Sequence, residues 1–102
     1  MFVVMTRVKL REGMADRCAD LFRQTNPDLV KNEKNWLGAK MLFDHDSSTV
    51  TVLASWNDIA SYNAMSARPE FQNTMKSFGE LFAGKPEIST HELLVDMVPE
   101  SI

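Results

Sequence analysis

The chain has 102 residues, of which 44% are hydrophobic and 25% charged, and it carries a net charge of −3 at pH 7. This length predicts a single domain over residues 1–102, and the composition is ordinary for a globular protein. The 11 basic residues are scattered, which argues against nucleic acid as a partner. The single cysteine, Cys18, excludes an internal disulfide framework and favours a reducing compartment. No apolar run approaches the roughly 20 residues that span a bilayer, so we expect a cytoplasmic protein with no membrane partner.

The first part of the chain predicts a strand followed by a helix. Apolar side chains alternate along Phe2–Leu10, which is the period of a strand. From Met14 onward the apolar residues recur at helical spacing. Because proline inside a helix costs about 3 kcal/mol, we expect this helix to end at Asn26, which would cap a second piece that has Pro27 in its first turn.

The middle of the chain predicts a hairpin. Trp36–Asp44 is densely apolar, and Thr49–Trp56 alternates between apolar and polar residues. The four polar residues between them are typical of a turn. Two strands joined by so short a segment are expected to pair antiparallel.

The last third predicts a helix in two pieces and a final strand. Asn57 or Asp58 can cap the first piece, and Pro69 suits the first turn of the second. The second piece carries one apolar stripe at helical spacing. We expect the final strand to cover Glu87–Val98, with apolar residues on both faces. The stripe consists of Phe71, Met75, Phe78 and Phe82.

The order β-α-β-β-α-β predicts an α+β, ferredoxin-like split β-α-β fold, a four-stranded antiparallel sheet with helices on one face. The opposite face would carry Val3, Met5 and Leu53, and is too apolar to remain in water. We therefore expect a homodimer that packs this face against a second copy.

Three motifs carry a family resemblance over roughly Phe2–Val98. The first motif, Ser55–Tyr62, has a tryptophan at the end of a predicted strand and the start of a helix directly after it. The second, Ser66–Phe71, contains small residues followed by a proline and an aromatic residue. The third, Arg7–Gly13, contains the end of a predicted strand, charged residues and a glycine. The chain resembles the antibiotic biosynthesis monooxygenase family. The resemblance implies a dimeric α+β barrel and the oxidation of a small aromatic, quinol- or anthrone-like substrate by molecular oxygen without a cofactor or metal.

The chain departs from the family at three positions. Many members carry histidine where this sequence has Met65. The haem-degrading members carry asparagine, tryptophan and a haem-ligating histidine at positions that align with Thr6, Met65 and Met75. The resemblance therefore argues against haem degradation, and it leaves the chain without the family's simplest general base. Haem ligation by the thioether of Met75 remains an alternative.

Trp56 and Tyr62 are the residues to which we assign catalysis, because tryptophan offers a ring face and one N–H donor and a tyrosine hydroxyl can orient a phenolic oxygen. The alternative interpretation is that both are ordinary core residues. Thr6, alone among apolar neighbours on its strand face, either hydrogen-bonds a ligand or the backbone. The small Ala54 and Ala64 are expected to leave space for the ligand. The predicted substrate-binding walls are Thr6, Met65, Phe71, Met75 and Phe78, where a plain helix-to-sheet core is the alternative.

The other residues whose side chains could act in catalysis or metal binding are interpreted as structural or surface residues. Asp44-His45-Asp46 has metal-ligand chemistry, but three consecutive residues cannot all point inward from one strand. His91 is a general base only if it faces the cavity, and we expect it on the dimer side or at the surface. Cys18 is interpreted as buried helix core.

Two function classes stay open from the sequence. The first is a monooxygenase that needs no cofactor. The second is a non-catalytic small-molecule-binding domain that keeps the fold and has lost the catalytic base. The retained Trp56 and Tyr62 favour the first, and the methionine at position 65 favours the second.

Overall fold

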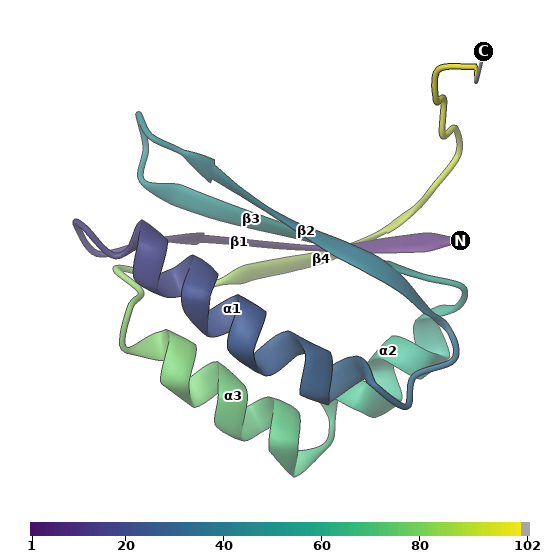
Figure 1. Ribbon diagram of the computed structural model, residues 1–102, viewed down its shortest axis with the longest axis horizontal. Coiled ribbons are helices and arrows are strands. Elements are labelled where there is room, and N and C mark those ends of the chain that lie inside the picture. Colours follow the sequence, from purple (N-terminus) through teal and green to yellow (C-terminus); the bar gives the residue numbers. More distant parts are fainter. Residues whose placement is uncertain (101–102) are drawn as a thin grey trace.

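The computed structural model of the protein describes residues 1–100, so the last two residues of the predicted domain lie outside the described part. The strands form one antiparallel sheet in the order β2-β3-β1-β4. The helices of the described part all lie on one face of this sheet (Figure 1), which is the predicted ferredoxin-like α+β arrangement. The elements are β1 (Phe2–Lys9), α1 (Ala15–Val30), β2 (Trp36–Asp44), β3 (Thr49–Trp56), α2 (Ile59–Ser66), α3 (Pro69–Gly79) and β4 (Glu87–Glu92).

The central strand β1 fixes which side chains face the helices. Val4 and Val8 are 2% and 4% exposed, whereas Arg7 and Lys9 are open to solvent. Because successive side chains of a strand point to opposite faces, Thr6 lies on the same side as the two buried valines. The register pairs Val8 with Val50 of β3, and this pair of buried β-branched residues stabilises the sheet on its helix side.

A β-bulge near the start of β2 changes which residues face the helices. The register against β3 shifts between Trp36 and Gly38, and Gly38 has a φ angle of 134° that residues with a side chain rarely adopt. The extra residue lets both Trp36 and Ala39 pack on the helix side of the sheet. Alternation alone would place these two residues on opposite faces.

Helix α1 runs without a break from Ala15 to Val30, so the prediction that it ends at Asn26 is wrong. Pro27 lies inside the helix and leaves the carbonyl of Arg23 without its helical N–H partner. The last turn is held by tertiary contacts, because Val30 is 7% exposed and the carbonyl of Leu29 accepts a 2.6 Å hydrogen bond from Arg68 Nη2. These contacts offset the unfavourable proline.

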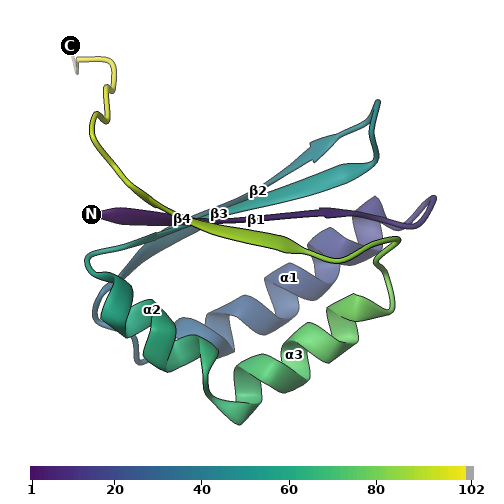
Figure 2. The ribbon, with the colours of Figure 1, turned by 180° about the vertical axis from the view of Figure 1, so that it is seen from behind.

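The second helical region is split into α2 and α3, as the sequence predicts. Asp58 is the N-cap of α2, and its Oδ1 accepts a 2.7 Å hydrogen bond from the backbone N–H of Ser61. Pro69 occupies the first turn of α3, where it needs no N–H partner. The short segment between the two helices turns the chain so that α3 lies beside α1 under the sheet (Figure 2).

Strand β4 is shorter than predicted, since it ends at Glu92 and not at Val98. The pairing of β4 with β1 reaches Phe2, and the last backbone contact is a 3.0 Å hydrogen bond from Leu93 N to the carbonyl of Met1. This contact lies one residue before the start of β1. The segment after it leaves the sheet, with Leu94 82% and Val98 75% exposed (Figure 1).

The face of the sheet opposite the helices stays uncovered within this chain (Figures 1 and 2). Leu37 and Leu42 on this face are 44% and 50% exposed. No helix in the described part is long and apolar enough to cross a membrane.

Candidate ligand cavity

An apolar cavity of about 120 Å³ lies between the sheet and the three helices. It separates two clusters of buried residues, one around Val8, Leu10 and Phe78 and the other around Val4, Trp56 and Met65. An engineered protein cavity of about 150 Å³ lined by apolar residues stays dry and binds benzene. This cavity is therefore of the size that accommodates one aromatic ring.

All seven residues assigned to the site from the sequence line this cavity, and they come from four elements. Thr6 projects from β1, Trp56 ends β3, Tyr62 and Met65 belong to α2, and the other three lie on α3. The placement of these residues is a matter of geometry, and their roles in binding or catalysis stay predictions. The seven are Thr6, Trp56, Tyr62, Met65, Phe71, Met75 and Phe78.

Trp56 and Tyr62 are neighbouring aromatic residues in the wall of the cavity. Their ring centroids are 5.8 Å apart at an interplanar angle of 72°, an edge-to-face contact. Trp56 is fully buried at 0% exposure. Within residues 1–100 its indole Nε1 is a buried donor that has no hydrogen-bond partner. A buried N–H without a partner costs about 1–3 kcal/mol, so an acceptor oxygen on a ligand would be stabilising there.

The titratable groups among the described lining residues are Cys18 and Tyr62. Burial raises the pKa of the Tyr62 hydroxyl above its ordinary value, and burial likewise raises the pKa of the Cys18 thiol. Both groups are thus protonated at neutral pH. Tyr62 is suited to donating or accepting a hydrogen bond and not to removing a proton from a substrate.

Several polar lining residues were not identified from the sequence. Thr25 and Asn26 of α1 and Thr74 of α3 reach the wall of the cavity. The hydroxyl of Thr25 donates a 2.8 Å hydrogen bond to the carbonyl of Leu21. The position of Thr25 in the apolar stripe of α1 could have identified it from the sequence as a lining residue, whereas Asn26 was interpreted as a helix cap. Ala64 is exposed and leaves no space for a ligand, unlike Ala54, which lines the cavity.

The remaining chemistry-bearing residues lie away from the cavity. His91 lies on the outer face of β4, where its Nε2 is 2.8 Å from the hydroxyl of Ser89. Asp44, His45 and Asp46 form the exposed tip of the hairpin, and Asp44 Oδ1 accepts a 2.9 Å hydrogen bond from the backbone N–H of Asp46. This backbone contact lowers the pKa of the Asp44 carboxyl. Within residues 1–100, no group of three His, Cys, Asp or Glu residues is placed to hold a metal ion.

Comparison with known proteins decides the family. The sequence profile of the antibiotic biosynthesis monooxygenases matches residues 1–77, from β1 into α3. The chain belongs to this family. The part of the chain that matches the antibiotic biosynthesis monooxygenase profile contains all the predicted site residues except Phe78, which lies just beyond it. No curated protein matches the chain.

Solved structures share the fold of this family member. A Bordetella bronchiseptica protein assigned to the antibiotic biosynthesis monooxygenases superposes with a TM-score of 0.80 at 16% identity, covering 92% of this chain and 97% of that one. A Mycobacterium tuberculosis protein gives 0.76 at 12% identity over 95% and 98%. A Nitrosomonas europaea protein of unknown function gives 0.74 at 22% identity over 98% and 95%. At identities this low the likeness shows a shared fold and not a shared reaction.

Proposed function

We propose that the protein is a cofactor-independent monooxygenase that oxidises a small, quinol-like aromatic molecule in the apolar cavity. The observation that supports this most is the fully buried Trp56, which lines the cavity and whose N–H has no partner in the described residues. The volume of about 120 Å³ favours a single ring. A tricyclic, anthrone-like substrate would require the helices to move apart.

In this proposal the ring lies among the apolar side chains, and one ring oxygen accepts a hydrogen bond from Trp56 Nε1. The hydroxyl of Tyr62, protonated because burial raises its pKa, orients a second oxygen of the substrate. Such a hydrogen bond is stronger to an ionised oxygen than to a neutral one. The cavity would therefore stabilise the electron-rich, deprotonated form of the substrate.

The reaction needs no electron donor besides the substrate. A quinol ring carbon that bears hydrogen is oxidised by O₂, one oxygen atom enters the ring at that carbon, and the other leaves as water. The substrate supplies all four electrons and ends as a hydroxyquinone. The role of the protein is to hold the substrate, to favour its anion and to exclude bulk water.

The cavity walls favour one alternative function. Neither lining group that titrates, Cys18 or Tyr62, is ionised at neutral pH. Position 65 holds a methionine, which is 5% exposed and belongs to the same buried cluster as Trp56. A non-catalytic domain that binds a small aromatic would have the same walls. Haem degradation by the family's known route is an unsuitable assignment, because Thr6, Met65 and Met75 replace the asparagine, tryptophan and haem-ligating histidine of the haem-degrading members.

We also propose that the protein is a homodimer, in which the sheet faces of two copies form the barrel. Support comes from the exposed apolar residues of the outer face, among them Leu37 and Leu42. The exposed segment after β4 has a further set of apolar side chains that would lie against the partner. It contains Leu94, Val95, Met97 and Val98.

Oxygen uptake tests the enzyme and separates it from the binding domain. Purified, chelator-treated protein is mixed in air with hydroquinone and methylhydroquinone, and oxygen is followed with an electrode. The enzyme predicts uptake that scales with protein concentration and falls strongly in Trp56→Phe. A protein that binds phenol in a calorimeter but consumes no oxygen above a blank is the binding domain.

A further inference from the structure

A second, polar pocket lies beside the apolar cavity, between the end of α1 and the start of α3. Its volume is about 520 Å³, several times that of the cavity. The two share Thr25, Leu29 and Thr74, so these side chains belong to the walls of both. We call this region the outer pocket. The residues that line it alone are Gln24, Asp28, Lys31, Asn32, Arg68 and Glu70.

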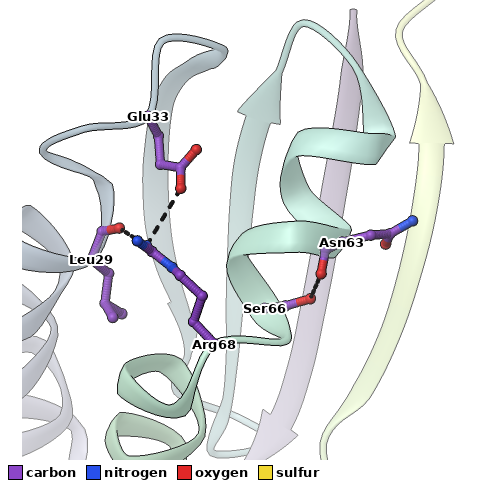
Figure 3. A network of polar contacts seen from close by, with 5 residues as sticks. All are labelled: Leu29, Glu33, Asn63, Ser66 and Arg68. Atoms are coloured by element: carbon purple, nitrogen blue, oxygen red, sulfur yellow. Dashed lines mark hydrogen bonds and ion pairs between the residues drawn. The ribbon is translucent and has the colours of Figure 1, made fainter.

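Arg68 is the charged residue of the outer pocket that is held in place. It extends from the junction of α2 and α3 toward the end of α1 (Figure 3). Its Nη2 donates to the carbonyl of Leu29 at 2.6 Å and lies 3.4 Å from Glu33 Oε1. Asp28, Lys31 and Glu70 are exposed, so solvent screens their charges more than that of the half-buried Arg68.

Two buried side-chain polar atoms lack a hydrogen-bond partner within residues 1–100, and both are N–H donors. One belongs to Trp56, which lines the apolar cavity, and the other belongs to Arg68, which lines the outer pocket. Complementary ligand groups are acceptors, and an arginine fork binds carbonyl and carboxylate oxygens well. The cavity itself accommodates about one ring. A longer substituent that passes between Thr25, Leu29 and Thr74 would reach the outer pocket.

We propose that the cavity and the outer pocket form one two-part site. Its ligand carries a single aromatic ring in the cavity and a short arm that ends in a carbonyl or carboxylate oxygen bound by Arg68. This assignment rests on the proposed function for the ring, and it names the substrate class more narrowly. Arg68 is then a specificity-determining residue, since the arm distinguishes the substrate from a plain quinol.

Calorimetric titration with three matched probes tests the arm. The probes are 4-propylphenol, 3-(4-hydroxyphenyl)propanamide and 3-(4-hydroxyphenyl)propanoate, which share the ring and the three-carbon arm. The expected result is that the amide and the propanoate bind at least about fivefold tighter than 4-propylphenol, as one added hydrogen bond predicts. Arg68→Met should abolish this preference and leave the affinity for 4-propylphenol nearly unchanged.

Two variants control for charge and for folding. Lys31→Met removes a positive charge from the same pocket, and the preference should persist because the guanidinium is intact. Arg68→Lys keeps the charge without the fork, and should lose most of the preference even if Arg68→Met fails to fold.

The outcomes separate the two proposals. If 4-propylphenol binds but wild type shows no preference for the carbonyl-bearing probes, the two-part site is refuted and the proposed function stands. Equal losses of preference in Lys31→Met and Arg68→Met also refute the assignment to Arg68. If none of the three phenols binds, both proposals fail.

Discussion

At the scale of single residues, Trp56 combines two properties that seldom occur together. It is fully buried, and within the described residues its N–H has no partner. Phenylalanine would also provide a buried aromatic ring, and it has no polar atom to leave unsatisfied. The cost of about 1–3 kcal/mol for such a donor is therefore easier to understand if a ligand supplies the acceptor.

Replacing the indole while keeping an aromatic ring isolates this donor. We predict that Trp56→Phe changes the free energy of unfolding by less than about 1.5 kcal/mol, measured by urea denaturation, because apolar volume is largely conserved. The affinity for phenol should fall by about fivefold or more, since one hydrogen bond is lost. Toluene, which has no oxygen, serves as the control probe. Equal changes for phenol and toluene would mean that the N–H plays no part in binding.

The ionisation of the cavity walls leads to a second residue-scale prediction. Because burial raises the pKa of both Tyr62 and Cys18, neither accepts a proton near neutral pH. The substrate must then reach its anion by its own ionisation. The pH dependence of oxygen uptake should therefore shift to lower pH for 2,5-difluorohydroquinone, which is more acidic and keeps two ring C–H carbons, than for methylhydroquinone.

The matched control for this pH profile is Tyr62→Phe, which should lower the rate and move the midpoint to higher pH by a similar amount for both quinols, because one hydrogen bond to the substrate anion is lost. An identical midpoint near neutrality for both quinols would contradict the account, since it would reveal a base that belongs to the protein.

At the scale of elements, the hairpin is the part of the fold that was predicted most accurately from the sequence. A densely apolar run before four polar residues and an alternating run after them predicted the bounds of β2 and β3, because the signals for these strands are local. The ends of α1 and β4 depend on distant parts of the chain instead. The last turn of α1 is held by Arg68, which lies 39 residues after Leu29, and β4 ends opposite the first residue of β1.

The same distinction applies to the site. Alternation and helical spacing put all seven assigned residues on the cavity side of their elements, because inward direction follows from periodicity. The outer pocket could not be predicted in this way. Arg68 looks like an ordinary surface arginine until the fold brings the end of α1 beside it (Figure 3).

The proline inside α1 gives a prediction at this scale. Pro27→Ala should raise the free energy of unfolding by about 1–3 kcal/mol, because alanine restores the hydrogen bond to the carbonyl of Arg23 and suits a helix interior. Urea denaturation measures the change. Pro69→Ala is the matched control, since Pro69 is in the first turn of α3 and its replacement should have a small effect. No gain from Pro27→Ala would mean that the proline is not a source of strain.

At the scale of the whole molecule, the uncovered sheet face predicts self-association. Leu53 is on this face, paired with Met5 of β1 and Lys40 of β2. Leu53→Glu would bury a charge in the proposed interface, so the dimer dissociation constant should rise at least about tenfold. Sedimentation velocity at micromolar concentration measures it.

The control for association is Asn73→Glu, which adds the same charge to an exposed position on α3. It should leave the dimer intact. A wild-type protein that sediments as a monomer at these concentrations would rule out the homodimer, whatever the variants do.

The central claim is that oxygen and a quinol-like ring react in this cavity without a cofactor. The most direct measurement is mass spectrometry of the product formed from methylhydroquinone under ¹⁸O₂ by chelator-treated protein. The account predicts one ¹⁸O atom in each hydroxyquinone molecule, formed at a rate that scales with protein and drops in Trp56→Phe. Label that appears no faster with protein than without it would contradict the account.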